Sequence, residues 1–362
     1  MRITAVRIRR HEVALDPPFY AAWDPVPRAV FEATIVLVET DEGLTGVGSG
    51  DTMDGFERYE HLFLGHDPLD IERHARVLET IALHAGRYWP LEAALWDLIG
   101  KEKGEPVARL LGGAVDRLPL YASCGELKPP QERAQSALRL REEGFRALKL
   151  RIERGRLHEG VATVRAVREA VGAQMEIMVD LNQGWRMPGD VTPPLPYEDV
   201  RRIAEELSLY GVRWLEEPLH GDDVRGLARL RAETDVPIAG GEMARAPALL
   251  DGYLEAGALD VYQPDGVVAV GILRAADVAR RALEHGLAFT PHTWTNGIGL
   301  LANLHLAAGV GGGPFLEYPY DPPGWTPERR DFMLAEPLRP GEDGCLHVPE
   351  RPGLGIELAD DV

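Results

Sequence analysis

Cysteines, long apolar runs and basic residues are all scarce in this sequence. Only Cys124 and Cys345 occur among 362 residues, too few for a disulfide framework or a thiolate metal cluster, so we expect a reducing, cytoplasmic location. No apolar stretch reaches the length of a membrane span. The first residues also lack the apolar core of a secretion signal, and we therefore expect no membrane partner.

The charge balance is strongly acidic. The chain has 39 Lys and Arg against 58 Asp and Glu, a formal net charge of −19, which argues against nucleic acid or an anionic membrane as a partner. An anionic small molecule stays possible, because a bound cation can reverse the local field. With 45% hydrophobic residues, the chain can bury the core of one barrel and a smaller domain.

Seven short apolar runs between residues 147 and 317 each end in a charged or imidazole side chain. The closing residues follow one another at intervals of 23 to 36 residues, about the length of one strand and one helix. Amphipathic, helix-length stretches lie between the runs, so the pattern predicts a parallel (β/α) barrel with its active site at the C-terminal strand ends. The closing residues are Arg151, Asp180, Glu216, Glu242, Asp265, His292 and Glu317.

The chain divides into three parts by pattern. Residues 1–117 begin with strand-like alternation, continue with helical periodicity and predict an N-terminal α+β capping domain. Residues 118–325 form the predicted barrel, the catalytic domain. Residues 326–362 are rich in proline, and residues 343–349 with 352–355 resemble a terminal hairpin. We expect this C-terminal tail to return to the capping domain.

Two segments of the capping domain are expected to be loops. Residues 17–28 combine prolines with Tyr20, Trp23 and Arg28, which fits a lid that binds substrate, although a solvated connector is an alternative. Arg28 suggests a distal carboxylate on the substrate, whereas the two aromatic residues would equally suit a ring. The glycine-rich residues 46–50 predict a second, flexible loop.

Three carboxylates at successive strand ends predict a metal site. Asp180, Glu216 and Glu242 offer hard oxygen ligands suited to Mg²⁺, and three such groups without a cation would repel one another. Each could instead cap a helix or pair with lysine, a reading that weakens when all three occur in series. Glu217 points the opposite way on its strand and is expected to support the site indirectly, and Asn182 is expected to line it.

Lys149 and Arg151 lie two residues apart and therefore on one face of a strand. They could hold a carboxylate substrate or act on its α-hydrogen, or else form a structural salt-bridge ladder. Lysine can act as a base when its pKa is lowered, and arginine rarely can.

Asp265 and His292 close neighbouring strands, so the carboxylate can fix the imidazole tautomer and make His292 a general base. Glu317 could donate a proton or hydrogen bond to a developing enolate oxygen if its surroundings keep it protonated, or could serve as a helix cap or an ion-pair partner.

In their order along the chain, these motifs resemble the enolase superfamily, in its mandelate racemase subgroup, over nearly the full length. The segments that carry the likeness are 94–98, 110–113, 149–151, 180–185, 216–218, 240–242, 263–265 and 292–294. The resemblance implies an α/β fold, an enolase-type (β/α) barrel under an α+β cap. It implies Mg²⁺ on Asp180, Glu216 and Glu242, proton transfer by His292, and Trp294 at the substrate. The muconate-lactonising branch would have lysine where this chain has Asp265.

One departure from the subgroup bears on the reaction. The usual Lys-x-Lys is here Lys149-x-Arg151, so the second base position carries a group that is very hard to deprotonate. We therefore expect a sugar-acid dehydratase, a lyase that eliminates water from a small-molecule carboxylate. A racemase or epimerase of a hydroxy acid, amino acid or betaine is the alternative, and a non-catalytic binding protein on the same fold is a third. A homo-oligomer is also expected.

Overall fold

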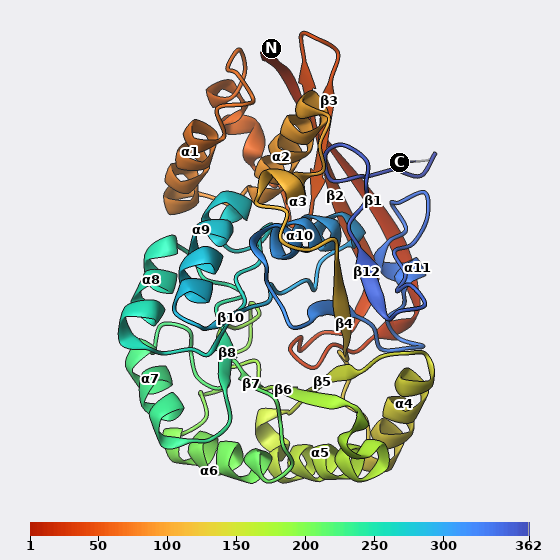
Figure 1. Ribbon diagram of the computed structural model, residues 1–362, viewed down its shortest axis with the longest axis vertical. Coiled ribbons are helices and arrows are strands. Elements are labelled where there is room, and N and C mark those ends of the chain that lie inside the picture. The colour runs from red at the N-terminus through yellow and green to blue at the C-terminus, as the bar shows by residue number, and fades with distance from the viewer. Residues whose placement is uncertain (361) are drawn as a thin grey trace.

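The computed structural model of the chain describes residues 1–360 and 362 and shows a capping region above a ring of strands and helices (Figure 1). The cap contains an antiparallel sheet in the order β1-β2-β3. Its apolar face packs against α2, which gives the cap a core of its own. The elements are β1 (Ile3–Phe19), β2 (Arg28–Thr40), β3 (Thr45–Ser49), α1 (Ile71–His84), α2 (Trp89–Lys103) and α3 (Val107–Leu110).

The prediction of a flexible loop at residues 46–50 was wrong, because most of this segment is the buried strand β3. Its glycines allow a close approach to α2 rather than mobility. A Cβ atom on Gly46 would lie 2.0 Å from the carbonyl oxygen of Ala94, and one on Gly48 would lie 2.1 Å from that of Pro90. Any side chain at either position would push the strand off the helix.

The predicted parallel barrel is confirmed. Its strands run in the order β10-β9-β8-β7-β6-β5-β4-β11, and Gly313, in the segment before β11, donates from N to Phe289 O of β10 at 2.8 Å. The strands are β4 (Arg117–Ser123), β5 (Ala147–Arg151), β6 (Glu176–Asp180), β7 (Leu215–Glu216), β8 (Ile238–Gly240), β9 (Val261–Tyr262), β10 (Ala288–Phe289) and β11 (Leu316–Pro319).

Helices follow the strands and form the outer wall of the barrel (Figure 1). Most have one apolar face, whereas α10 is buried on all sides because it lies between the barrel and α3 of the cap. The helices are α4 (Pro130–Glu142), α5 (Leu157–Val171), α6 (Tyr197–Ser208), α7 (Val224–Glu233), α8 (Pro247–Ala256), α9 (Gly271–Glu284) and α10 (Gly297–Val310).

The strand register explains why charged residues far apart in sequence meet. Parallel pairing sets Arg151 of β5 opposite Asp180 of β6, and Asp180 opposite Glu216 of β7. Three charged strand ends therefore form one row at the same rim. Glu242 lies two residues beyond the end of β8, the next strand in the sheet.

The C-terminal tail contacts both parts of the molecule. After the short helix α11 (Pro327–Arg330), strand β12 (Cys345–His347) pairs antiparallel with β4, so the first arm of the predicted hairpin joins a barrel strand. The chain then reaches the cap, where Gly353 O accepts from Val107 N at 2.9 Å and Leu354 N donates to Asp97 Oδ1 at 2.8 Å.

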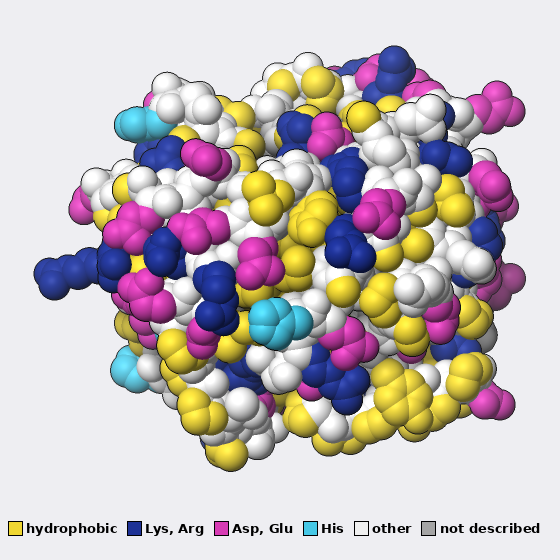
Figure 2. Space-filling model, turned by 90° about the horizontal axis from the view of Figure 1, so that it is seen from below, with side chains coloured by type: hydrophobic (Ala, Val, Ile, Leu, Met, Phe, Trp, Pro, Cys, Tyr) yellow, Lys and Arg dark blue, Asp and Glu magenta, His cyan; other side chains and the backbone are white. Residues whose placement is uncertain are grey.

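The surface mixes charges of both signs. Figure 2 shows acidic and basic side chains interspersed, with apolar patches between them, on the face seen from below. Within residues 1–360 and 362, every helix is too short or too polar to cross a bilayer.

Candidate active site

The three predicted metal ligands lie together. Asp180, Glu216 and Glu242 are buried, and one carboxylate oxygen from each lies within 4.8 Å of the others. Trp185 Nε1 donates to Glu242 Oε1 at 2.6 Å, whereas the buried Oε2 of Glu242 has no hydrogen-bond partner in the described part of the chain. An unpaired buried carboxylate oxygen is costly without a cation. The site therefore fits a hard divalent ion such as Mg²⁺.

Neighbouring side chains fix these carboxylates in place. Glu216 Oε2 accepts from Trp214 Nε1 at 3.1 Å and from Gln263 Nε2 at 2.9 Å. Asn182 adopts a φ of 46°, and its N–H donates to Asp180 Oδ1 at 2.7 Å. Such support restricts the carboxylate rotamers and so prepares the site for an ion.

Glu217 is outside the cluster of three carboxylates and lines a separate cavity. It is the second non-glycine residue with a positive φ in the described chain, at 43°. Its carboxylate is buried beside Gly184, where a Cβ atom would lie 2.1 Å from Glu217 Oε1. Burial and the charge of Glu242 raise the pKa of Glu217 well above its ordinary value. A strained, buried carboxyl at the end of a barrel strand is typical of a functional region.

Lys149 and Arg151 both point at the carboxylates. Lys149 Nζ pairs with Glu216 and lies 2.7 Å from Glu317 Oε1. Arg151 pairs with Asp180, donates from Nε to Cys124 O at 3.1 Å, and lies 4.6 Å from the centroid of the Trp23 ring. Burial alone would lower the pKa of each cation, but the adjacent carboxylates raise it above its ordinary value. Both residues are therefore fixed cations.

His292 and Asp265 form the predicted pair. His292 Nδ1 lies 3.0 Å from Asp265 Oδ2, which leaves Nε2 directed at the carboxylates, 3.9 Å from Glu242 Oε2. Burial by itself lowers the pKa of His292, but the charge of Glu242 and the bond to Asp265 raise it to about 9. This geometry suits a histidine that accepts a proton at Nε2.

Glu317 does not meet the condition under which it was expected to donate a proton. Its carboxylate accepts from Ser123 Oγ and Thr293 N, each at 2.7 Å, and pairs with Lys149. Burial alone would raise the pKa of Glu317, but the charges of Lys149 and His292 outweigh it and lower the pKa to about 2. Glu317 is therefore ionised in this structure and holds Lys149 in position.

A cavity of about 220 Å³ lies in front of these groups. Of the sequence-predicted substrate-binding residues, all but Tyr20 line it, and Tyr20 is 60% exposed at the mouth of an adjoining cavity. Arg28 is already paired, with Nε 2.9 Å from Asp24 Oδ2. The lining residues with named roles or polar groups are Trp23, Arg28, Asp51, Arg151, Asn182, Trp185, Glu242, His292, Trp294 and Thr295.

Some residues of the site were not predicted from the pattern of strand ends. Ser123 donates to Glu317 and accepts from Trp294 Nε1 at 2.7 Å. It ends β4, so extending the series of strand ends backward by one strand would have found it. Met243 and Val268 line the cavity from the segments after β8 and β9, and their apolar side chains gave no chemical signal.

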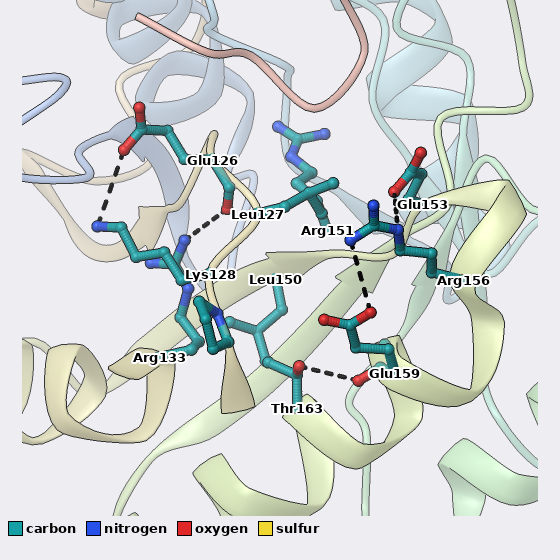
Figure 3. A pocket seen from close by; sticks show the side chains of 12 residues that line it. Glu126, Leu127, Lys128, Arg133, Leu150, Arg151, Glu153, Arg156, Glu159 and Thr163 are labelled. Atoms are coloured by element: carbon teal, nitrogen blue, oxygen red, sulfur yellow. Dashed lines mark hydrogen bonds and ion pairs between the residues drawn. The ribbon is translucent and has the colours of Figure 1, made fainter. Parts of the chain in front are cut away.

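A smaller cavity of about 150 Å³ lies on the other side of Arg151 (Figure 3). Its charged groups are engaged in ion pairs: Arg156 lies 3.4 Å from Glu153 and 3.7 Å from Glu159, and Arg133 lies 2.8 Å from Asp321 outside the cavity. Figure 3 shows the pairs of Arg156 drawn together while the Arg151 guanidinium points away from them. This cavity thus has little unbalanced charge to offer a ligand.

Two family comparisons cover most of the chain. Residues 3–112 match the mandelate racemase / muconate lactonizing enzyme, N-terminal domain family. Residues 132–362 match the enolase C-terminal domain-like family. The two matches correspond to the cap and to the barrel with its tail.

Individual relatives are similar over nearly all of the chain. D-galactarolactone cycloisomerase of Agrobacterium fabrum is 30% identical over 100% of this chain and 97% of that protein. L-talarate/galactarate dehydratase of Salmonella typhimurium is 29% identical over 91% of this chain and 81% of that protein. A racemase from Streptomyces coelicolor A3(2), solved with bound magnesium, has a TM-score of 0.83 and 28% identity and covers 99% of this chain and 98% of its own.

Proposed function

Because the chain belongs to the mandelate racemase/muconate lactonizing enzyme family of the enolase superfamily, we propose that it is a sugar-acid dehydratase. In this proposal His292 removes the proton α to the substrate carboxylate, and a hydroxyl group leaves the β-carbon as water. Enzymes similar to this chain include dehydratases, cycloisomerases, racemases and epimerases. The observation that supports elimination is the state of Arg151.

Arg151 cannot act as a base in this position, because its guanidinium stays protonated. It pairs with Asp180, donates to the carbonyl of Cys124 and lies over the ring of Trp23. Each contact favours the charged guanidinium. Racemisation needs a base on each face of the α-carbon, and here only His292 has the chemistry of a base. Elimination needs one base for the α-proton and one acid for the leaving group, and His292 can supply both in turn.

The remaining charged residues have separate roles in the proposed reaction. Lys149 and Arg151 present cations to the substrate carboxylate, and both are held there by ion pairs to Asp180 and Glu317. Held on Asp180, Glu216 and Glu242, Mg²⁺ would supply positive charge that favours loss of the α-proton. Asp265 stabilises the imidazolium after His292 has accepted the proton.

A cycloisomerase is the second candidate, favoured by the full-length similarity to D-galactarolactone cycloisomerase. The same α-proton abstraction by His292 would then expel a ring oxygen that stays within the molecule, so no water is lost. An epimerase is the remaining alternative and requires a second base.

A screen in D₂O with Mg²⁺ tests the proposal. Mono- and diacid sugars and their lactones would be incubated with the enzyme, keto product measured with a carbonyl reagent, and α-deuterium measured by NMR. Keto product from open-chain acids that His292→Asn abolishes and His285→Asn leaves unchanged would support a dehydratase. The His285→Asn change is the matched control because that histidine lies exposed at the end of α9.

The other outcomes separate the alternatives. Ring opening of a lactone without turnover of the open acid would favour the cycloisomerase. Deuterium uptake without any elimination would favour the epimerase and contradict the role given to Arg151. Absence of both exchange and product across the panel would favour a non-catalytic binding protein.

A further inference from the structure

Arg87 is a cation without an evident structural role. It lies in the short connection between α1 and α2 of the cap and is half-buried. Its Nη1 is buried and has no hydrogen-bond partner in the described part of the chain. A guanidinium nitrogen left in this state destabilises the fold. Residues that carry such a cost are typical of binding sites.

Arg87 lines a cavity of about 610 Å³ that is distinct from the catalytic one. Three arginines and two acids line this second cavity, so its formal charge is positive although the whole chain carries −19. The charged residues are Arg87, Arg186, Arg245, Glu217 and Asp222. A positive cavity in an acidic protein favours an anionic ligand.

The second cavity adjoins the catalytic cavity. Trp185, Met187 and Met243 line both of them, and methionine side chains adapt readily to a ligand. The charge of Arg87 also acts on Asp51, which lines the catalytic cavity. One extended ligand can therefore lie with one end at His292 and the other end near Arg87.

Other cations around the catalytic cavity are already engaged. Arg28 pairs with Asp24 at 2.9 Å, Arg151 pairs with Asp180, and Arg154 pairs with Asp190. A distal anion on the substrate would have to displace one of these carboxylates, whereas Nη1 of Arg87 has an open donor. The expectation that Arg28 binds a distal carboxylate is therefore replaced.

We infer that Arg87 binds the distal carboxylate of a dicarboxylate sugar acid, and that the second cavity is the subsite for that end of the substrate. The inference rests on the proposed function for the proximal carboxylate, which Lys149 and Arg151 hold. Arg87 acts here as a residue that determines specificity. It would hydrogen-bond the carboxylate that a monoacid lacks.

The test measures binding without turnover. The Mg²⁺-loaded His292→Asn enzyme would be titrated by calorimetry with galactarate and galactonate, which differ only in a carboxylate or a hydroxymethyl group at C6. Glucarate with gluconate and mannarate with mannonate extend the panel to other hydroxyl configurations. We expect the diacid of at least one pair to bind about 10- to 100-fold tighter, the range of a charge-assisted hydrogen bond.

Two matched variants assign that preference to a residue. Arg87→Met in the His292→Asn background should abolish the preference for the diacid and leave the affinity for the monoacid unchanged. Arg28→Met removes the same charge from the first residue of β2 and should retain the preference. Equal affinities within every pair, no binding of any ligand, or a preference lost only in Arg28→Met would overturn the inference.

Thermal unfolding separates binding from a structural role. Because Nη1 of Arg87 is desolvated and unpaired, Arg87→Met should leave the Tm of the ligand-free protein unchanged or raise it. A lower Tm together with equal losses of affinity for diacid and monoacid would show a structural role and overturn the inference. Diacid binding through Arg87 without elimination by wild-type enzyme would contradict the proposed function alone.

Discussion

Asp265 holds one carboxylate oxygen 3.0 Å from Nδ1 of His292 and places its other oxygen 3.0 Å from Nδ2 of Asn303. The N–H of Val267 also donates to this second oxygen, at 2.8 Å. With three partners the carboxylate cannot rotate, so His292 keeps one tautomer and directs Nε2 at the substrate cavity.

Asp265→Asn should therefore reduce kcat by up to about 10⁴-fold with little change in KM, because an asparagine beside Nδ1 can hold the wrong tautomer of a reacting imidazole. The substitution removes a negative charge beside His292, whose pKa is raised to about 9, and so lowers that pKa. Because the base must be unprotonated, the rising limb of kcat/KM should move to lower pH. A pH–rate profile with an unmoved limb would contradict the role of Asp265.

Mg²⁺ binding should raise the stability of the folded protein. At a free Mg²⁺ concentration 100 times its Kd, the free energy of unfolding should rise by about 2.7 kcal/mol, because the ion binds only the folded protein. Glu242→Gln should abolish this rise, since it replaces the carboxylate whose Oε2 is buried without a partner.

Glu217→Gln is the control for that experiment. Glu217 is also a buried carboxyl, but it lines the second cavity and is not one of the three proposed metal ligands. Thermal melts with EDTA and with Mg²⁺ should show the shift in this variant. Loss of the shift in Glu217→Gln alone would contradict the assignment of the ligands.

The barrel and its reactive rim were predictable because two regularities coincide. A polar residue at the end of an apolar run is visible in sequence, and parallel pairing places consecutive strand ends side by side, as with Asp180 and Glu216. The protonation state of a side chain in the folded protein, however, is determined by its neighbours. Glu317 is ionised because Lys149 lies 2.7 Å away, a contact between residues 168 positions apart.

Residues outside that regularity could not be placed from sequence. Arg87 lies between two helices of the cap, and nothing in its local pattern indicates that the fold carries it to the barrel mouth. Gly46 and Gly48 illustrate the opposite error, because glycine is compatible both with flexibility and with tight packing. Only the position of α2, which contacts both residues, distinguishes these two readings.

Arg151→Lys should change the course of the reaction. A lysine in this position loses the contact with the Trp23 ring and can deprotonate, so a base would face the α-carbon opposite His292. We expect α-deuterium to enter unreacted substrate with inversion of configuration, and elimination to slow.

NMR of the recovered acid in D₂O measures exchange, and chiral chromatography measures inversion. Arg154→Lys is the control, since Arg154 pairs with Asp190 at the mouth of the site and lines an adjoining cavity instead of the catalytic one. Exchange with complete retention in Arg151→Lys would mean that His292 alone still handles the proton.

Stability should fall on acidification because of His305 on α10. Ala108 N donates to its Nδ1 at 3.0 Å, and Nε2 lies 3.2 Å from Leu354 O. Burial lowers the pKa of His305 from 6.5 to about 4. Between these values the unfolded chain binds a proton that the folded chain does not, so His305 costs stability as the pH falls, by about 1.4 kcal/mol per unit.

His305→Gln should remove that contribution, because glutamine can accept from Ala108 N and donate to Leu354 O without titrating. Urea unfolding at pH 7, 6 and 5 measures the slope, and His285→Gln on the exposed end of α9 is the control. We expect a shallower loss of stability between pH 7 and 5 in His305→Gln only. Parallel curves for the two variants would mean that His305 is protonated in the folded state, which would break the contact joining α10 to α3 and the C-terminal tail.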